Sequence, residues 1–92
     1  MTTTMPGVIT GTTINLGKVH KVILFNDEAH SMDEVVTQIC KAINCDSNQA
    51  TMIMFEAHKT GRAVVYTGHL ERCEHVESVL AEIKLGTKIE EA

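Results

Sequence analysis

Two helix-start signatures follow each other closely in the middle of the sequence. Ser31 is followed by Glu34, and Asp46 is followed by Gln49, each at a spacing of three residues. This spacing is typical of helix N-termini, where the first side chain accepts a backbone hydrogen bond and the second returns one. Apolar residues recur at helical spacing behind both signatures. The sequence therefore predicts two consecutive short helices with almost no linker, and Gly61 is expected to end the second one.

Short runs of β-forming residues flank these helices. A third stretch of apolar residues at helical spacing lies before the last run, and Gly86 is expected to end that helix. The resulting order is β-α-α-β-α-β, which predicts an α+β fold: a two-layer sandwich in which a three-stranded antiparallel sheet packs against three helices. The expected strands are residues 19–25, 63–67 and 87–90, and the expected helices begin at Met32, Asp46 and Leu70.

The first seventeen residues differ from the rest of the chain. Residues 1–17 contain six Thr and three Gly but no charged side chain, and their apolar residues follow neither a strand nor a helix period. Such a segment offers no face that could pack on a core. We therefore expect residues 1–17 to be a flexible N-terminal extension and residues 18–92 to be the folded domain.

Charge and hydropathy exclude several classes of protein. The chain has 8 Lys and Arg against 12 Asp and Glu, a formal net charge of −4, and its basic residues are scattered singly. Nucleic acid is not an expected partner, because binding phosphates requires clustered positive charge. No apolar run reaches the roughly 18 residues of a membrane helix, and no signal peptide is recognisable. Three Cys without a CxxC pair indicate reduced thiols, and we expect a cytoplasmic protein.

A few residues could carry chemistry. The acidic turn Asn26-Asp27-Glu28 follows the first strand, and His58 lies near the end of the second helix. Taken alone, these residues favour structural roles in a turn and at a helix C-terminus. His69 and Cys73 share a helix face and could serve a metal or a nucleophile, but a structural zinc site takes four ligands. We expect no metal and no cofactor, although an enzyme that pairs His58 with Asp27 stays open as an alternative.

The order and spacing of four segments resemble the ClpS adaptor family. These segments are Lys21–Glu28, Met32 followed by Val35 and Val36, Ala50–His58 and Gly61–Val64. The resemblance extends over about residues 18–92. It implies a non-enzymatic adaptor that binds N-degron peptides and proteins by their first residue, which is Leu, Phe, Tyr or Trp. It also implies delivery of these substrates to the N-domain of a ClpA- or ClpC-type unfoldase, for degradation by ClpP.

The same resemblance assigns residues to the site. It implies that Asn26, Asp27 and His58 bind the free α-amino group, and that Met32 disfavours β-branched first residues. The implied walls of the hydrophobic pocket are Ile23, Met32, Val35, Met54, Ala57 and Leu85. The implied docking residues for the unfoldase are Glu71, Glu74 and His75 at the start of the third helix.

Some positions depart from the family pattern. His30 and Ser31 occupy positions where Thr and Pro are frequent in the family, and Ala57 occupies one where Val is frequent.

We expect a monomer in the cytoplasm, or in the plastid stroma if the chain is a processed form. The alternative function is a ClpS-like docking domain that modulates an unfoldase without recognising N-degrons.

Overall fold

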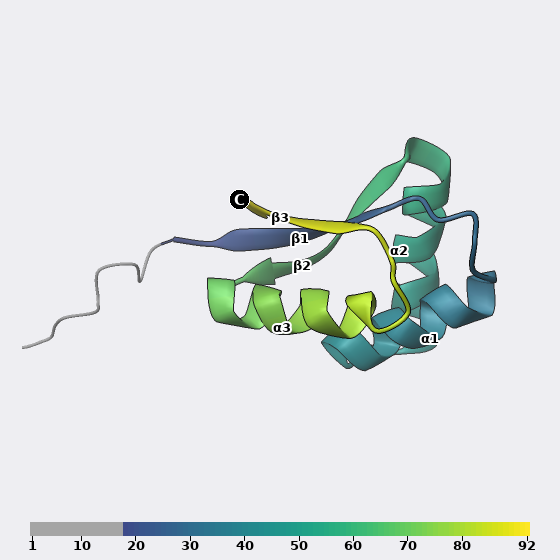
Figure 1. Cartoon of the computed structure of the whole chain (residues 1–92), viewed down its shortest axis with the longest axis horizontal. Coiled ribbons are helices and arrows are strands. Elements are labelled where there is room, and N and C mark those ends of the chain that lie inside the picture. The colour runs from purple at the N-terminus through teal and green to yellow at the C-terminus, as the bar shows by residue number, and fades with distance from the viewer. Residues whose placement is uncertain (1–17) are drawn as a thin grey trace, which may run out of the picture.

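The computed structural model describes residues 18–92, and the predicted extension at residues 1–17 lies outside this range (Figure 1). The observed order of elements is β-α-α-β-α-β, so the predicted order is confirmed. The elements are β1 (His20–Phe25), α1 (Met32–Ile43), α2 (Ser47–Thr60), β2 (Arg62–Gly68), α3 (Leu70–Ala81) and β3 (Thr87–Glu91).

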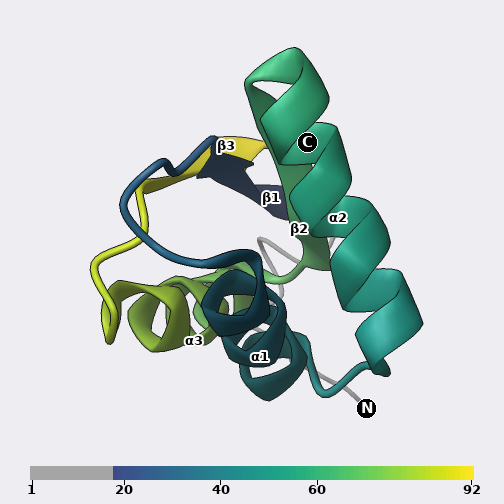
Figure 2. The same ribbon diagram turned by 90° about the vertical axis from the view of Figure 1, so that its right-hand side faces the viewer.

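The first strand lies in the centre of the sheet. The strand order is β2-β1-β3, and β1 pairs antiparallel with both neighbours. A register shift between Val22 and Ile23 marks an irregularity in the β1–β2 ladder. All three helices lie on one side of the sheet, with α1 and α3 below it and α2 alongside in the view of Figure 2. The predicted two-layer α+β sandwich is therefore confirmed.

The two faces of the central strand have different surroundings. Val22 and Leu24 belong to the buried core with residues of all three helices, such as Ile39 and Leu80. Because side chains alternate along a strand, Ile23 points to the opposite face. There it pairs with Val64 of β2 and with a residue of β3, and it is not part of the core cluster.

The predicted capping signature of α1 is complete, whereas that of α2 is present only in its first half, since Gln49 returns no side-chain bond to Asp46. Ser31 Oγ accepts from the Glu34 N–H at 3.2 Å, and Glu34 Oε1 accepts from the Ser31 N–H at 2.9 Å. Asp46 Oδ1 accepts from the Gln49 N–H at 2.8 Å. Gly61 ends α2 with a positive φ of 96°, a conformation in which a side chain would be strained. These local bonds explain why two helices can follow each other with so short a connection.

The end of α3 differs from the prediction. The helix ends at Ala81, well before Gly86, and the left-handed residue is Lys84 with φ 63°. The N–H of Leu85 donates to the Leu80 carbonyl at 3.3 Å, and the N–H of Lys84 donates to the Ala81 carbonyl at 2.9 Å. This pair of bonds is a Schellman motif. The reversal buries Leu85 in the core, which offsets the backbone strain at Lys84.

Candidate functional site

The loop that leaves β1 is fixed on both sides by backbone hydrogen bonds. Phe25 donates its N–H to the Gly86 carbonyl at 3.0 Å, and Asn26 donates its N–H to the Gly61 carbonyl at 3.0 Å. Gly61 is the residue that ends α2, so the second bond brings the acidic turn beside the last turn of that helix, which contains His58. The acidic turn and His58 are about thirty residues apart in the sequence, and the antiparallel pairing of β1 with β2 brings them together.

A cavity of about 190 Å³ opens at this junction. Its size is comparable to an engineered apolar cavity of about 150 Å³ that holds benzene, so it has room for one apolar side chain. The lining comes from the end of β1, the following loop, the start of α1 and the C-terminal half of α2. The lining residues are Leu24, Phe25, Asn26, Asp27, Glu28, His30, Met32, Val35, Met54, Ala57 and His58.

The cavity has an apolar interior and a polar rim. Val35, Met54 and Ala57 are nearly completely buried, whereas the Met32 residue is 51% exposed at the mouth. Among the described residues that line the cavity, two are carboxylates and two are histidines, and none is Lys or Arg. An excess of acceptors and negative charge beside an apolar interior suits a ligand that combines a cation with an apolar group.

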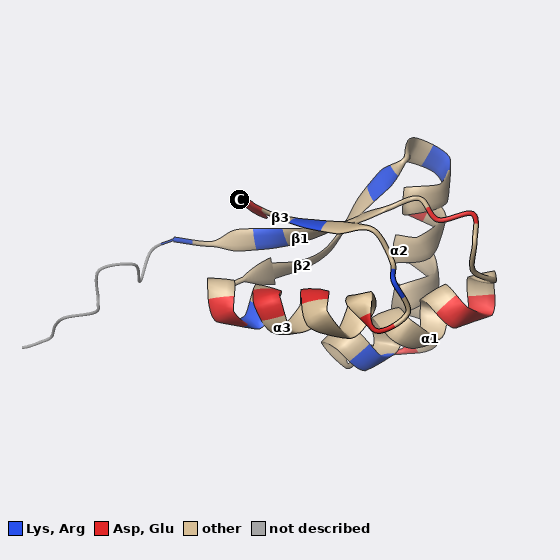
Figure 3. Ribbon diagram, in the orientation of Figure 1, with Lys and Arg blue, Asp and Glu red and all other residues tan. Residues whose placement is uncertain are grey.

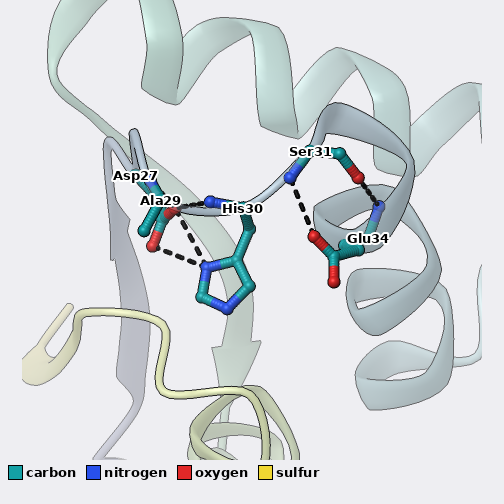
Figure 4. A network of polar contacts seen from close by, with 5 residues as sticks. All are labelled: Asp27, Ala29, His30, Ser31 and Glu34. Atoms are coloured by element: carbon teal, nitrogen blue, oxygen red, sulfur yellow. Dashed lines mark hydrogen bonds and ion pairs between the residues drawn. The ribbon is translucent and has the colours of Figure 1, made fainter.

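The Asp27 carboxylate is bonded within its own loop. Its Oδ1 accepts from the N–H of Ala29 at 2.8 Å and from the N–H of His30 at 2.7 Å. The imidazole Nδ1 of His30 lies 3.0 Å from Oδ1 and 3.1 Å from Oδ2 (Figure 4). Burial alone would raise the pKa of Asp27, but the hydrogen bonds from His30 and Ala29 outweigh it and lower that pKa below its ordinary value. The carboxylate is therefore ionised at neutral pH.

Asn26 and Glu28 form a second polar pair. The side-chain amide of Asn26 donates from Nδ2 to Glu28 Oε2 at 3.0 Å. Only the NH₂ group of an amide can donate to a carboxylate, so this bond fixes which way the amide is turned. The amide oxygen of Asn26 and the second oxygen of Glu28 then remain as acceptors for a ligand.

The structure brings most of the predicted site residues to this cavity. Asn26, Asp27 and His58 lie at its rim, and four predicted apolar residues lie in its wall: Met32, Val35, Met54 and Ala57. Two predicted wall residues, Ile23 and Leu85, do not line it. Ile23 faces the other side of the sheet, and Leu85 is packed in the core behind the Schellman motif.

Four of the lining residues were not among the predicted site residues: Leu24, Phe25, Glu28 and His30, although Glu28 belongs to the acidic turn that the sequence indicated. The predicted end of the strand at Phe25 is confirmed, but the sequence did not indicate that the cavity extends to Leu24 and Phe25. The bond from the His30 N–H to Asp27 could have been expected from the sequence, since Asp and Asn commonly accept from backbone N–H groups two or three residues ahead.

The predicted docking residues lie elsewhere on the molecule. Glu71, Glu74 and His75 are exposed in the first half of α3. This half of α3 is at the end of the molecule away from the loop at residues 26–31 (Figure 1). Acidic residues recur along this helix, where they are coloured red on the ribbon of Figure 3. A partner bound there would leave the cavity free.

Within residues 18–92, no group of three or more His, Cys, Asp or Glu side chains is arranged to hold a metal ion. Cys73 is fully buried, its Sγ contacts the Gly68 carbonyl at 3.7 Å, and burial raises the pKa of its thiol. A protonated, buried thiol is neither a nucleophile nor an accessible ligand, so the geometry does not favour the His69–Cys73 alternative. No helix in the described part of the chain has the length and apolar character needed to cross a membrane.

This geometry defines a small α+β domain with a cavity for one side chain at the end of its central strand. Residues 16–85 match the family described as "ATP-dependent Clp protease adaptor protein ClpS". The chain therefore belongs to the ClpS family of Clp protease adaptor proteins.

Individual relatives agree with this assignment. The chain is 43% identical over 63 residues to ClpS 1 of Bradyrhizobium diazoefficiens, covering 67% of this chain and 61% of that protein. It is 38% identical over 69 residues to ClpS of Acetivibrio thermocellus, covering 71% of this chain and 70% of that protein.

A second kind of relative is a ubiquitin ligase. The chain is 34% identical over 58 residues to human E3 ubiquitin-protein ligase UBR2, and this match covers 63% of this chain and only 3% of that protein.

The structure is similar to that of ClpS2 from Agrobacterium tumefaciens, solved with bound L-phenylalaninamide, and the TM-score between the two folds is 0.76. That match has 21% sequence identity and covers 82% of this chain and 98% of the other.

Proposed function

We propose that this protein binds the free amino-terminal residue of N-degron substrates and delivers them to a ClpA- or ClpC-type unfoldase for degradation by ClpP. The observation that carries the proposal is the cavity, in which carboxylates, an amide and histidines surround the entrance to an apolar interior. The ClpS2 relative bound to L-phenylalaninamide supports it, since that ligand combines a free amine with an apolar side chain.

The polar rim suits an α-ammonium group. This group has a reference pKa of about 7.7 to 8.0, so it is largely cationic near neutral pH and carries three donors. We assign its acceptors to the amide oxygen of Asn26 and a neutral nitrogen of His58. Asp27 contributes negative charge, although its oxygens already accept from its own loop. Glu28, held by Asn26 at 3.0 Å, joins them as a direct partner.

The apolar interior would receive the first side chain. Burying a Leu or Phe side chain contributes roughly 1.5 to 3 kcal/mol, which gives a preference among first residues but does not suffice for tight binding. The ammonium contacts supply the rest, so both parts of the cavity must be filled together. The expected first residues are Leu, Phe, Tyr and Trp, and the small Ala57 leaves more room than the Val that is frequent in the family.

Fluorescence anisotropy with a labelled ten-residue peptide tests the proposal. A peptide that begins with Leu should bind, whereas the same peptide N-acetylated should bind at least about 10-fold more weakly, because it has lost the cation and its donors. A peptide that begins with Arg is the second control. If no free-amine peptide binds, including those beginning with Phe, Tyr or Trp, the proposal is wrong and the docking-domain alternative takes its place.

Met32 is expected to control which first residues enter. Its side chain stands at the mouth of the cavity, so a shorter residue should admit side chains that branch at Cβ. The Met32→Ala variant should bind peptides beginning with Ile or Val about 10-fold more tightly than the wild type does, measured by anisotropy. Met52→Ala is the matched control, because Met52 is 73% exposed and does not line the cavity. Unchanged discrimination in Met32→Ala would mean that Met32 only fills space.

Delivery completes the proposal. We assign docking on the unfoldase N-domain to Glu71, Glu74 and His75, which leave the cavity open while docked. Residues 1–17 would act as the extension used during transfer, and residues 18–92 as the adaptor core. The adaptor would act as a cytoplasmic monomer, or in the plastid stroma if processed, and without catalysis of its own.

A further inference from the structure

The loop between β1 and α1 is held at its two ends by different means. At its start, the N–H of Asn26 donates to the Gly61 carbonyl at 3.0 Å. At its end, Ser31 and Glu34 exchange the two bonds of the capping box. Between these points, four side-chain contacts that hold residues 27–30 involve Asp27 as acceptor, and one further bond joins the Asn26 amide to Glu28. The middle of the loop therefore depends on how the Asp27 carboxylate is oriented.

His30 determines that orientation. The two backbone N–H donors reach only Oδ1, whereas the imidazole Nδ1 lies 3.0 Å from Oδ1 and 3.1 Å from Oδ2 (Figure 4). Nδ1 is thus the one group in the described chain that contacts both oxygens. An ionised carboxylate only accepts, so Nδ1 must carry a proton. A neutral His30 is therefore the Nδ1–H tautomer. The pair is well shielded, since the side chains of His30 and Asp27 are 20% and 14% exposed.

This orientation decides which carboxylate is available at the cavity. With Asp27 bonded to His30, the neighbouring Glu28 is the partner of Asn26. Without the imidazole, Oδ2 of Asp27 has no donor, and an ionised oxygen at that position would compete with Glu28 for the amide of Asn26. Asn26 and Glu28, the acceptors at the rim, would then no longer be held in a single conformation.

We propose that His30 is a positioning residue of the amino-terminus pocket: by donating from Nδ1 to Asp27, it holds the loop in the form that presents Asn26 and Glu28 to the α-ammonium group. This inference rests on the proposed function for its effect on binding. It assigns a role to a residue that lines the cavity and that the acidic turn alone does not indicate.

Peptide affinity of three variants tests the role. His30→Ala removes the donor and should weaken binding of the Leu-initiated peptide between about 3-fold and 10-fold. His30→Asn keeps an N–H donor near the position of Nδ1 and should bind within about 2-fold of the wild type. His69→Ala is the control for loss of a histidine, because His69 is exposed and makes no capping bond. Wild-type affinity in His30→Ala, or no rescue in His30→Asn, would overturn the inference.

The tautomer of His30 provides a second measurement that needs no peptide. Long-range ¹H–¹⁵N correlation spectra of the free wild-type protein near pH 9 should show a protonated Nδ1 in His30. An unprotonated Nδ1 would overturn the inference while leaving the proposed function intact if the peptide binds. If the wild type binds no free-amine peptide, the proposed function fails and the positioning role fails with it, even where Nδ1 is protonated.

Discussion

A peptide that begins with leucine should bind the His58→Ala variant at least about 10-fold more weakly than the wild-type protein, because a hydrogen bond to a charged group contributes about 1.5 to 3 kcal/mol. His58 lines the cavity from the last turn of α2, and its side chain is exposed enough that folding should not depend on it. The loss should therefore appear in peptide affinity and not in the free energy of unfolding.

Two matched variants make this result specific. Lys59→Ala changes the next residue of the same helix, which does not line the cavity, and should leave affinity unchanged. His58→Gln retains an acceptor oxygen and should recover part of the lost affinity. Anisotropy at a fixed pH above 7 measures all three. Equal affinities of His58→Ala and Lys59→Ala would remove His58 from the proposed site.

The largest effect on stability is expected from Leu80→Ala. Leu80 is completely buried, and its carbonyl accepts the bond that closes the Schellman motif after α3. Truncating such a leucine costs about 2 to 5 kcal/mol, as lost burial and an empty cavity. A folded domain of the length of residues 18–92 is stabilised by about 4 to 11 kcal/mol in total. The variant should therefore lose a large part of its stability, which urea unfolding followed by circular dichroism measures.

Leu70→Ala is the control for Leu80→Ala. Leu70 lies in the same helix but is 43% exposed, so its truncation should cost about 1 kcal/mol or less. A cost for Leu80→Ala no larger than that for Leu70→Ala would contradict the described core.

The fold was largely predictable because its boundaries are local. Ser31 and Asp46 start helices through bonds to residues three positions ahead, and Gly61 ends one because its φ is positive. The end of α3 was not predictable in this way. There the chain reverses at Lys84, a residue without left-handed preference, because burial of Leu85 in a core formed by distant residues offsets the strain.

The candidate site was predicted where its residues are close in the sequence or match the family pattern. Asn26, Asp27, Met32 and His58 all lie at the cavity. Ile23, which was predicted as a wall residue, does not line the cavity. Side chains alternate along a strand, and which face meets the helices is set by packing that the short apolar run does not reveal. The contact between His30 and both oxygens of Asp27 depends on loop geometry, which residue types alone do not give.

The position of β1 in the sheet has a consequence for the time at which the protein becomes competent to bind. β1 is the first strand of the described chain, yet its partners are β2 and the last strand, with His20 opposite Glu91. The bond that fixes Phe25 next to the cavity likewise comes from Gly86. During synthesis, therefore, the hydrogen bond that holds Phe25 at the cavity cannot form before Gly86 has left the ribosome. On the proposed function, the binding of amino termini would therefore be expected only after β3 has paired with β1.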